Sequence, residues 1–263
     1  MGSMRSRTLA FAWRSLVAGL AACAMSGALA EGPPAPASPG TEPAWLPPAP
    51  SERLARALRL RAEGDIAGAR AQLELALATA PAYDAARLEC ADLLLSDGSD
   101  LDEATALLAG VRAPGTHGQI LSAWLAELRG DEAGAAAAYA NALEAGDDPD
   151  VRLHRALALD RLGRRDEAIR ELERVRKARP GDAVARGRLA ALYEAAGRIR
   201  EADAEYRALA AARPERAQGW EDLARFCDRT GRDAEAQAAH ARARTARGQA
   251  SARELRQLPP SSR

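Results

Sequence analysis

The stretch GRIREADAEYRALAAARP, from Gly197 to Pro214, decides the fold because its skeleton recurs along the chain. A glycine is followed five residues later by an alanine and seventeen residues later by a proline, and the same spacing occurs at Gly163, Ala168 and Pro180. A catalytic site has no reason to recur at a fixed interval, whereas a structural module that cannot bury its own apolar face has to be repeated. The recurrence therefore predicts a repeat protein whose surface binds a partner.

Six glycines define the period of this repeat. Upstream of each lies a stretch with apolar residues at three- and four-residue spacing, such as Leu189, Ala190 and Tyr193 in GRLAALYEAAG, and a second stretch follows. Glycine can end a helix in the left-handed conformation, so each unit is predicted to be two helices joined by a turn. The units must stack because neither helix pair can bury its apolar face alone. The glycines are separated by 34, 32, 33, 34 and 34 residues and stand at Gly64, Gly98, Gly130, Gly163, Gly197 and Gly231.

These features resemble tetratricopeptide repeats, which share the 34-residue period, the small residue in the first helix and the glycine at the turn. In the last repeat Trp220, Leu223, Ala224, Gly231 and Ala236 stand in the family's spacing. The resemblance implies an all-α fold, a right-handed α-solenoid of about six helix-turn-helix repeats over residues 50–248. The repeats begin near Pro50, Asp84, Thr116, Pro149, Ala183 and Ala217.

Parts of the array depart from this pattern. The second repeat, GSDLDEATALLAGVRAP, has one extra residue before Ala104 and reaches Pro114 early, so its second helix or turn is expected to be irregular. Residues 249–263 are expected to form a short capping helix and a tail. Arginines stand where the family prefers large apolar residues; either their aliphatic stems cover apolar surface or the register shifts by one residue there. They are Arg53, Arg56, Arg152 and Arg155.

The composition agrees with a helical body. Apolar residues make up 47% of the chain, aromatic residues only 4%, and alanine and leucine favour helix over sheet. Acidic and basic residues balance at 37 each, so no net field favours nucleic acid as a partner.

The N-terminus has the layout of a secretory signal over residues 1–30, with basic residues followed by the apolar run Ser15–Ala30. Two processing sites fit. Ala28-Leu29-Ala30 suits a signal peptidase, whereas Leu20-Ala21-Ala22-Cys23 resembles the lipobox of bacterial lipoproteins, in which the cysteine is lipidated. Residues 31–49 form a proline-rich linker. The protein is thus expected to be exported to the periplasm, with outer-membrane anchoring through Cys23 as the lipidated alternative.

Nothing in the sequence predicts catalysis, a cofactor or a metal site. The three histidines have no partner at metal-ligand spacing, and phosphate-binding loops and nucleophile motifs are missing. Cys90 and Cys227 are expected to be core residues, four repeats apart. The acidic group Asp147, Asp148 and Asp150 is expected to cap a helix rather than bind calcium.

By its family resemblance the first helix of each repeat lines a concave groove. The implied ligand is an apolar or amphipathic protein segment, extended or helical, with Trp124 as its anchor. The alternative is that these leucines close the helix pairs. The flatter end of the groove includes Gly187 and Ala191. The predicted groove residues are Leu54, Leu58, Leu88, Asp92, Ile120, Trp124, Leu153, Leu157, Glu221 and Arg225.

The sequence thus predicts a non-catalytic protein-interaction scaffold or adaptor in the bacterial cell envelope. Two alternatives stay open at this point. The array could be a self-associating structural component of an envelope assembly, which would make it an oligomer. It could also be an accessory repeat that regulates an enzyme.

Overall fold

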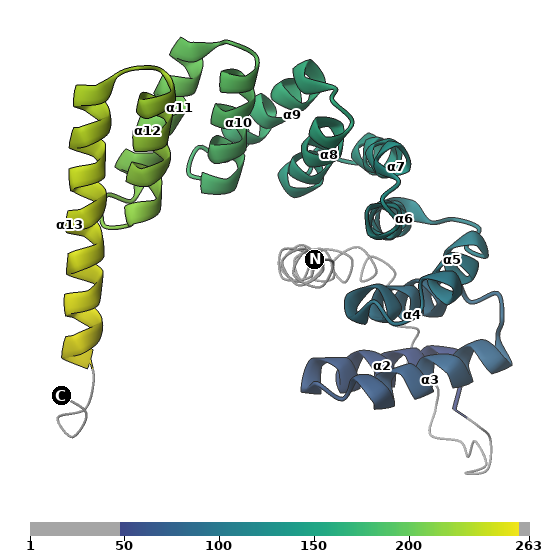
Figure 1. Ribbon diagram of the computed structural model, residues 1–263. Helices are drawn as coiled ribbons and strands as arrows, with labels where there is room; N and C mark the ends of the chain where they lie inside the picture. The colour runs from purple at the N-terminus through teal and green to yellow at the C-terminus, as the bar shows by residue number, and fades with distance from the viewer. Residues whose placement is uncertain (1–47, 258–263) are drawn as a thin grey trace. The chain divides into compact units, whose positions relative to one another are not determined.

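The computed structural model describes residues 48–257, the last seven of them by their backbone alone. Twelve α-helices and no strand occur in this part of the chain (Figure 1), which confirms the all-α prediction. None of the described helices is both long and apolar enough to cross a bilayer. The predicted signal peptide, Cys23 and nearly all of the proline-rich linker lie outside the described residues.

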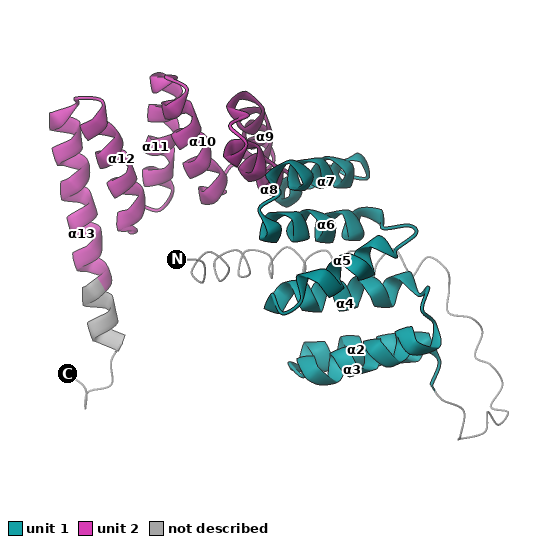
Figure 2. Cartoon of the chain, turned by 45° about the vertical axis from the view of Figure 1, so that its right-hand side comes forward, with its two compact units in different colours: residues 1–151 teal, residues 152–263 magenta. Residues whose placement is uncertain are grey.

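The chain divides into two compact units, residues 1–151 and 152–263, which are coloured separately in Figure 2. In the first unit the helices pair in chain order, α2 with α3, α4 with α5 and α6 with α7. The pairs stack, since α3 packs on α4 and α6 packs on both α4 and α5. The helices are α2 (Pro50–Glu63), α3 (Ile66–Thr79), α4 (Asp84–Asp97), α5 (Leu101–Ala109), α6 (Gly115–Arg129) and α7 (Glu132–Glu144).

The second unit repeats this arrangement. Helix α10 pairs with α11 and α12 with α13, while α9 packs on α10 and α11 on α12. The division between the units falls within α8, at Val151 and Arg152. The helices are α8 (Pro149–Arg161), α9 (Arg165–Ala178), α10 (Ala183–Ala195), α11 (Ile199–Ala212), α12 (Ala217–Arg229) and α13 (Asp233–Gln257).

The last helix is longer than the sequence analysis expected. Helix α13 continues through Gly248 to Gln257, so residues 249–257 extend it and do not form a separate capping helix. A single glycine costs a helix only about 1 kcal/mol relative to alanine, and no proline lies between Asp233 and Pro259. The glycine alone is therefore too weak to end the helix.

The six periodic glycines all stand between the two helices of a pair, at φ angles from 67° to 87°. An added Cβ at any of them would meet no heavy atom within 4 Å. The requirement for glycine therefore comes from the left-handed backbone, which other residues adopt only at an energetic cost, and not from crowding. This placement confirms the glycines as corners of the repeat.

The second repeat is irregular, as predicted, because α5 has only nine residues. Two side chains of α4 bind the backbone that follows α5. Arg87 donates to the carbonyl oxygen of Gly110, and the Asp84 carboxylate accepts a hydrogen bond from the backbone N–H of Arg112 at 3.2 Å. These contacts satisfy polar groups that a longer helix would have paired internally.

The predicted helix cap and the two predicted core cysteines are both confirmed. Asp148 accepts the backbone N–H groups of Asp150 and Val151, which makes it the cap of α8. Cys90 and Cys227 are buried and free, and burial raises the pKa of the Cys90 thiol to about 11. Both cysteines therefore act as core residues.

A buried carboxylate explains two of the four arginines that stand at apolar positions of the family pattern, Arg152 and Arg155. Glu171 is 6% exposed and binds Arg152 at 2.6 Å and Arg155 at 2.9 Å. Thirty-four residues further on, Glu205 is 3% exposed and binds Arg186 at 2.7 Å and Arg176 at 2.5 Å. The repeat thus reproduces an ion pair between its two helices. At Arg152 and Arg155 the guanidinium groups have carboxylate partners, so no shift of register is needed.

Replacement of Glu205 by alanine should lower the free energy of unfolding by about 2 kcal/mol, because Arg176 and Arg186 would lose a buried partner. The matched control is Glu201→Ala, which removes an exposed pair with Arg198 and should lower the free energy of unfolding much less than Glu205→Ala does. Urea unfolding followed by circular dichroism measures both. Equal losses for the two variants would contradict a structural role for the buried pair.

Candidate functional site

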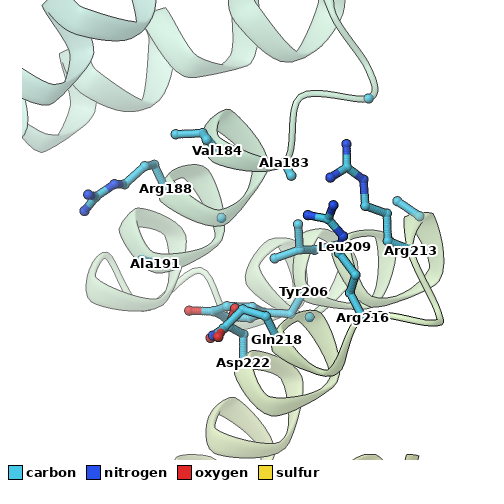
Figure 3. Close-up of a pocket in the computed structure, with 14 residues that line it drawn as sticks. Ala183, Val184, Arg188, Ala191, Tyr206, Leu209, Arg213, Arg216, Gln218 and Asp222 are labelled. Carbon is cyan, nitrogen blue, oxygen red and sulfur yellow. The ribbon is translucent and has the colours of Figure 1, made fainter. Parts of the chain in front are cut away.

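A hollow of about 450 Å³ lies in the second unit, between α10, α11 and α12 (Figure 3). Its apolar lining comes from Ala183, Val184 and Ala191 on α10 and from Leu209 and Ala212 on α11. Val184 is 57% exposed, the largest exposed fraction among the large hydrophobic residues of the described chain. Exposed aliphatic surface in a concave site is the usual feature of a binding pocket.

Two glycines set the shape of the hollow. At Gly219 an added Cβ would lie 2.9 Å from the Cα atom of Ala210, so glycine allows α12 to approach α11 closely. At Gly187 an added Cβ would meet only the Cδ2 atom of Leu209, at an ordinary 3.8 Å. Gly187 therefore leaves space open, whereas Gly219 fixes the packing of the helices that enclose it.

The base of the hollow is held by an aromatic pair. Tyr206 is 6% exposed, and its ring centroid lies 4.9 Å from that of Phe226. The Tyr206 hydroxyl donates to Glu194 at 3.1 Å. Burial, followed by the nearby Glu194 carboxylate, raises the pKa of Tyr206 to about 12. The phenol therefore stays neutral at physiological pH and serves to hold α11 against α12.

Three arginines, Arg188, Arg213 and Arg216, surround the hollow. All three are exposed, and within the described residues none of their side chains has a hydrogen bond or ion pair. In Figure 3 Arg213 and Arg216 extend from the α11–α12 connection on the side of Leu209, and Arg188 extends from α10 on the side of Val184. The hollow is thus apolar inside and positively charged at its edge.

Asp222 is the single carboxylate among the lining residues. It already binds the side chains of Gln218, at 3.0 Å, and Arg225. It therefore does little to offset the three arginines.

The groove residues predicted from the first unit lie among packed side chains. Asp92, Ile120 and Trp124 are buried, with exposed fractions of 1%, 0% and 3%. Leu54, Leu58 and Leu88 are half-buried. Leu54 also packs against the core cluster of α2, α3 and α4.

Asp92 belongs to a charged cluster on α2 and α4. Arg61 lies 2.6 Å from Asp92 and 2.9 Å from Glu89, so one guanidinium serves two carboxylates. Burial, and then the charge of Asp92, raises the pKa of Glu89 above its ordinary value. The cluster links the first two repeats, and its carboxylates face an arginine of the same unit.

In the second unit the predicted groove residues Leu153, Leu157, Glu221 and Arg225 do not line the hollow. Leu153 and Leu157 are half-buried on α8. Glu221 binds Arg247 at 2.5 Å, and Arg225 is exposed and binds Asp222. Of the positions considered for the groove, Gly187 and Ala191 are the ones that line the hollow.

Leu209 and the three arginines line the hollow but were not predicted as groove residues from the sequence. The predicted groove comprised only fixed positions of each first helix, whereas Leu209 lies on a second helix and two of the arginines lie in a connection. The available signal was the sequence RPER, residues 213–216, between two first helices that each carry a glycine, Gly187 in the fifth repeat and Gly219 in the sixth.

Over residues 48–250, no group of three or more histidine, cysteine, aspartate or glutamate side chains is arranged to hold a metal ion.

The two glycines of the hollow should respond oppositely to the same substitution. Gly187→Ala should raise the free energy of unfolding by about 0.5 to 1 kcal/mol, because alanine favours the helix and fits the space. Gly219→Ala should lower it by about 1 to 3 kcal/mol, because the added methyl group overlaps the α11 backbone. Urea unfolding of both variants measures the difference, and a change of the same sign in both would contradict the described packing.

Comparison with known proteins agrees with this architecture. Residues 163–221, which include most of the hollow, match the family model described as "Tetratricopeptide repeat". No curated protein matches the chain in sequence.

Among solved structures, PilW, described as a widely conserved type IV pilus biogenesis factor, is similar with a TM-score of 0.60. It shows 18% identity over 73% of this chain and 90% of its own. A tetratricopeptide repeat protein from Parabacteroides merdae ATCC 43184 gives a TM-score of 0.60 at 21% identity, over 72% and 77% of the two chains.

YrrB, described as a TPR protein with an unusual peptide-binding site, gives a TM-score of 0.57 at 17% identity, over 66% of this chain and 91% of its own. At such identities the likeness shows the fold. Together with the family match over residues 163–221, it confirms the predicted α-solenoid class.

Proposed function

We propose that this chain is a tetratricopeptide-repeat protein and a non-catalytic scaffold that binds a protein segment in the hollow between α10, α11 and α12. The observation that carries the proposal is the exposed Val184 above an apolar space of about 450 Å³. Aliphatic surface in such a space is stabilised when a partner's apolar side chain covers it, at about 25 cal/mol per Å² removed from water. Concave, mostly apolar sites of this size are the usual ligand sites of proteins.

The structural neighbours support this proposal at the level of the fold. YrrB is described as having a peptide-binding site, which shows that such a repeat can present one. PilW is described as a pilus biogenesis factor, which agrees with a role in assembling a structure of the cell envelope. A scaffold role also fits an architecture built from repeated helix pairs, whose stability does not depend on any single polar site.

We further propose that the protein is exported and acts in the bacterial cell envelope. The basis is the apolar run Ser15–Ala30 after three arginines, together with the proline-rich segment that follows. Cleavage after Ala30 would release the protein into the periplasm, whereas lipidation of Cys23 would anchor it to the outer membrane. In both cases the repeats would face partners of the envelope.

Blocking the hollow tests the proposed binding. Peptides selected from a random displayed library on the full chain should bind the wild type and Gly187→Ala equally. They should bind Gly187→Leu at least tenfold more weakly, because the leucine side chain occupies the apolar space. Circular dichroism should show an intact helical fold in both variants, since leucine favours helix over glycine. Failure to select any peptide, or equal binding to Gly187→Leu, would contradict the proposal.

The two export routes differ in one substitution. Under the lipidated alternative, Cys23→Ser should move the protein from the membrane fraction to the soluble periplasmic fraction, because the acyl chains would be lost. Under the cleaved alternative, wild type and variant should both be periplasmic. Recovery of both from the cytoplasm would contradict export.

A further inference from the structure

We infer that the segment bound in the hollow carries an apolar side chain flanked by carboxylates. This inference rests on the proposed function, since it specifies the chemistry of the ligand at the same site. Its basis is the contrast between the apolar interior and the three arginines at the edge.

These three arginines differ from most other arginines of the second unit. Arg186, Arg207, Arg229 and Arg232 each bind a carboxylate within 3 Å. Arg188, Arg213 and Arg216 have no such partner among the described residues. In a chain with 37 acidic and 37 basic residues, this leaves a local excess of positive charge at the hollow.

The acidic residues near the hollow are already engaged or lie elsewhere. The Asp182 carboxylate accepts the backbone N–H groups of Val184 and Ala185 and caps α10. Asp222 binds Gln218 and Arg225. Glu215 lines a separate hollow with Trp220 and Arg242. Carboxylates supplied by a partner would therefore meet arginines that have no competing acidic partner.

The arrangement also defines the order of groups in the ligand. Val184 and Arg188 are four residues apart on α10, so they lie on the same side of the helix. Arg213 and Arg216 lie by Leu209, on the other side of the hollow (Figure 3). When a bound peptide places an apolar side chain between Val184 and Leu209, the peptide residues on either side of it lie near the arginines. Guanidinium groups bind carboxylates through paired hydrogen bonds, which suits this position.

A protein segment fits these features better than a nucleic acid does. Single-stranded nucleic acids need exposed aromatic rings on which bases stack. The aromatic residue of this hollow, Tyr206, is buried against Phe226, and the exposed lining is aliphatic. Aliphatic side chains of a peptide match this lining, and acidic side chains match its edge.

The test uses the full chain and fluorescent synthetic peptides of equal length. Each carries one leucine flanked by glutamate, glutamine or lysine. The glutamate peptide should bind at least tenfold more tightly than the glutamine peptide, and the lysine peptide most weakly. Added salt should reduce the preference, because the arginines are exposed.

Charge reversal locates the preference. The triple variant Arg188→Glu, Arg213→Glu, Arg216→Glu should lose the preference for glutamate and bind the lysine peptide better than the wild type does. A matched control with the same net charge is Arg170→Glu, Arg200→Glu, Arg244→Glu, three exposed positions outside the hollow. This control should keep the glutamate preference.

The outcomes separate this inference from the proposed function. Equal binding of the glutamate and glutamine peptides, still abolished by Gly187→Leu, would overturn the charge preference and leave peptide binding intact. Loss of the preference in both triple variants would overturn a local role for the three arginines. Binding of anionic phosphatidylglycerol vesicles through these arginines, without binding of any peptide, would overturn both proposals.

Discussion

Each helix pair of this chain has an apolar face that it cannot bury by itself. A glycine in the left-handed conformation reverses the chain between the two helices of each pair, which allows successive pairs to stack. Gly197 and its five counterparts place the second helix against the first, and the next pair then covers the face that remains. Because no side chain crowds these corners, the constraint lies in the backbone alone. Alanine dominates the resulting core, so the helices approach closely. The presence or absence of one methyl group then decides whether space is filled or open, as at Gly187 and Gly219.

Charge is used in two different ways along this scaffold. Inside the second unit, Glu171 of α9 binds two arginines of α8, and Glu205 of α11 binds one arginine of α9 and one of α10. These ion pairs fix the helices relative to each other at the cost of desolvating the charges. At the edge of the hollow stand arginines that have no carboxylate partner among the described residues: Arg188, Arg213 and Arg216. The paired arginines support the fold, whereas the unpaired ones are available to a ligand. Binding chemistry can therefore vary at the edge without disturbing the ion pairs that support the repeats.

Much of the fold could be predicted from the sequence, because the spacing of the glycines and their position between two helices are local features that recur in every repeat. The early end of the second repeat was also visible, at Pro114. The hollow was harder to predict, since it depends on how three helices pack and on which side chains are missing. Gly187 looked like a flat part of the groove, and its open space became evident only with Leu209 from another helix. The buried partners of Arg152 and Arg155 were equally hard to predict, because the residue pattern of one helix does not show which side chains of the neighbouring helix it meets.

We propose above all that this protein binds its partner in the hollow between α10, α11 and α12. The most direct measurement is the methyl NMR spectrum of the full chain during titration with a bound peptide. The account predicts that the methyl resonances of Val184 and Leu209 shift first and saturate together. Shifts confined to Leu54, Leu58 and Leu88 of the first unit, with Val184 and Leu209 unchanged, would contradict it.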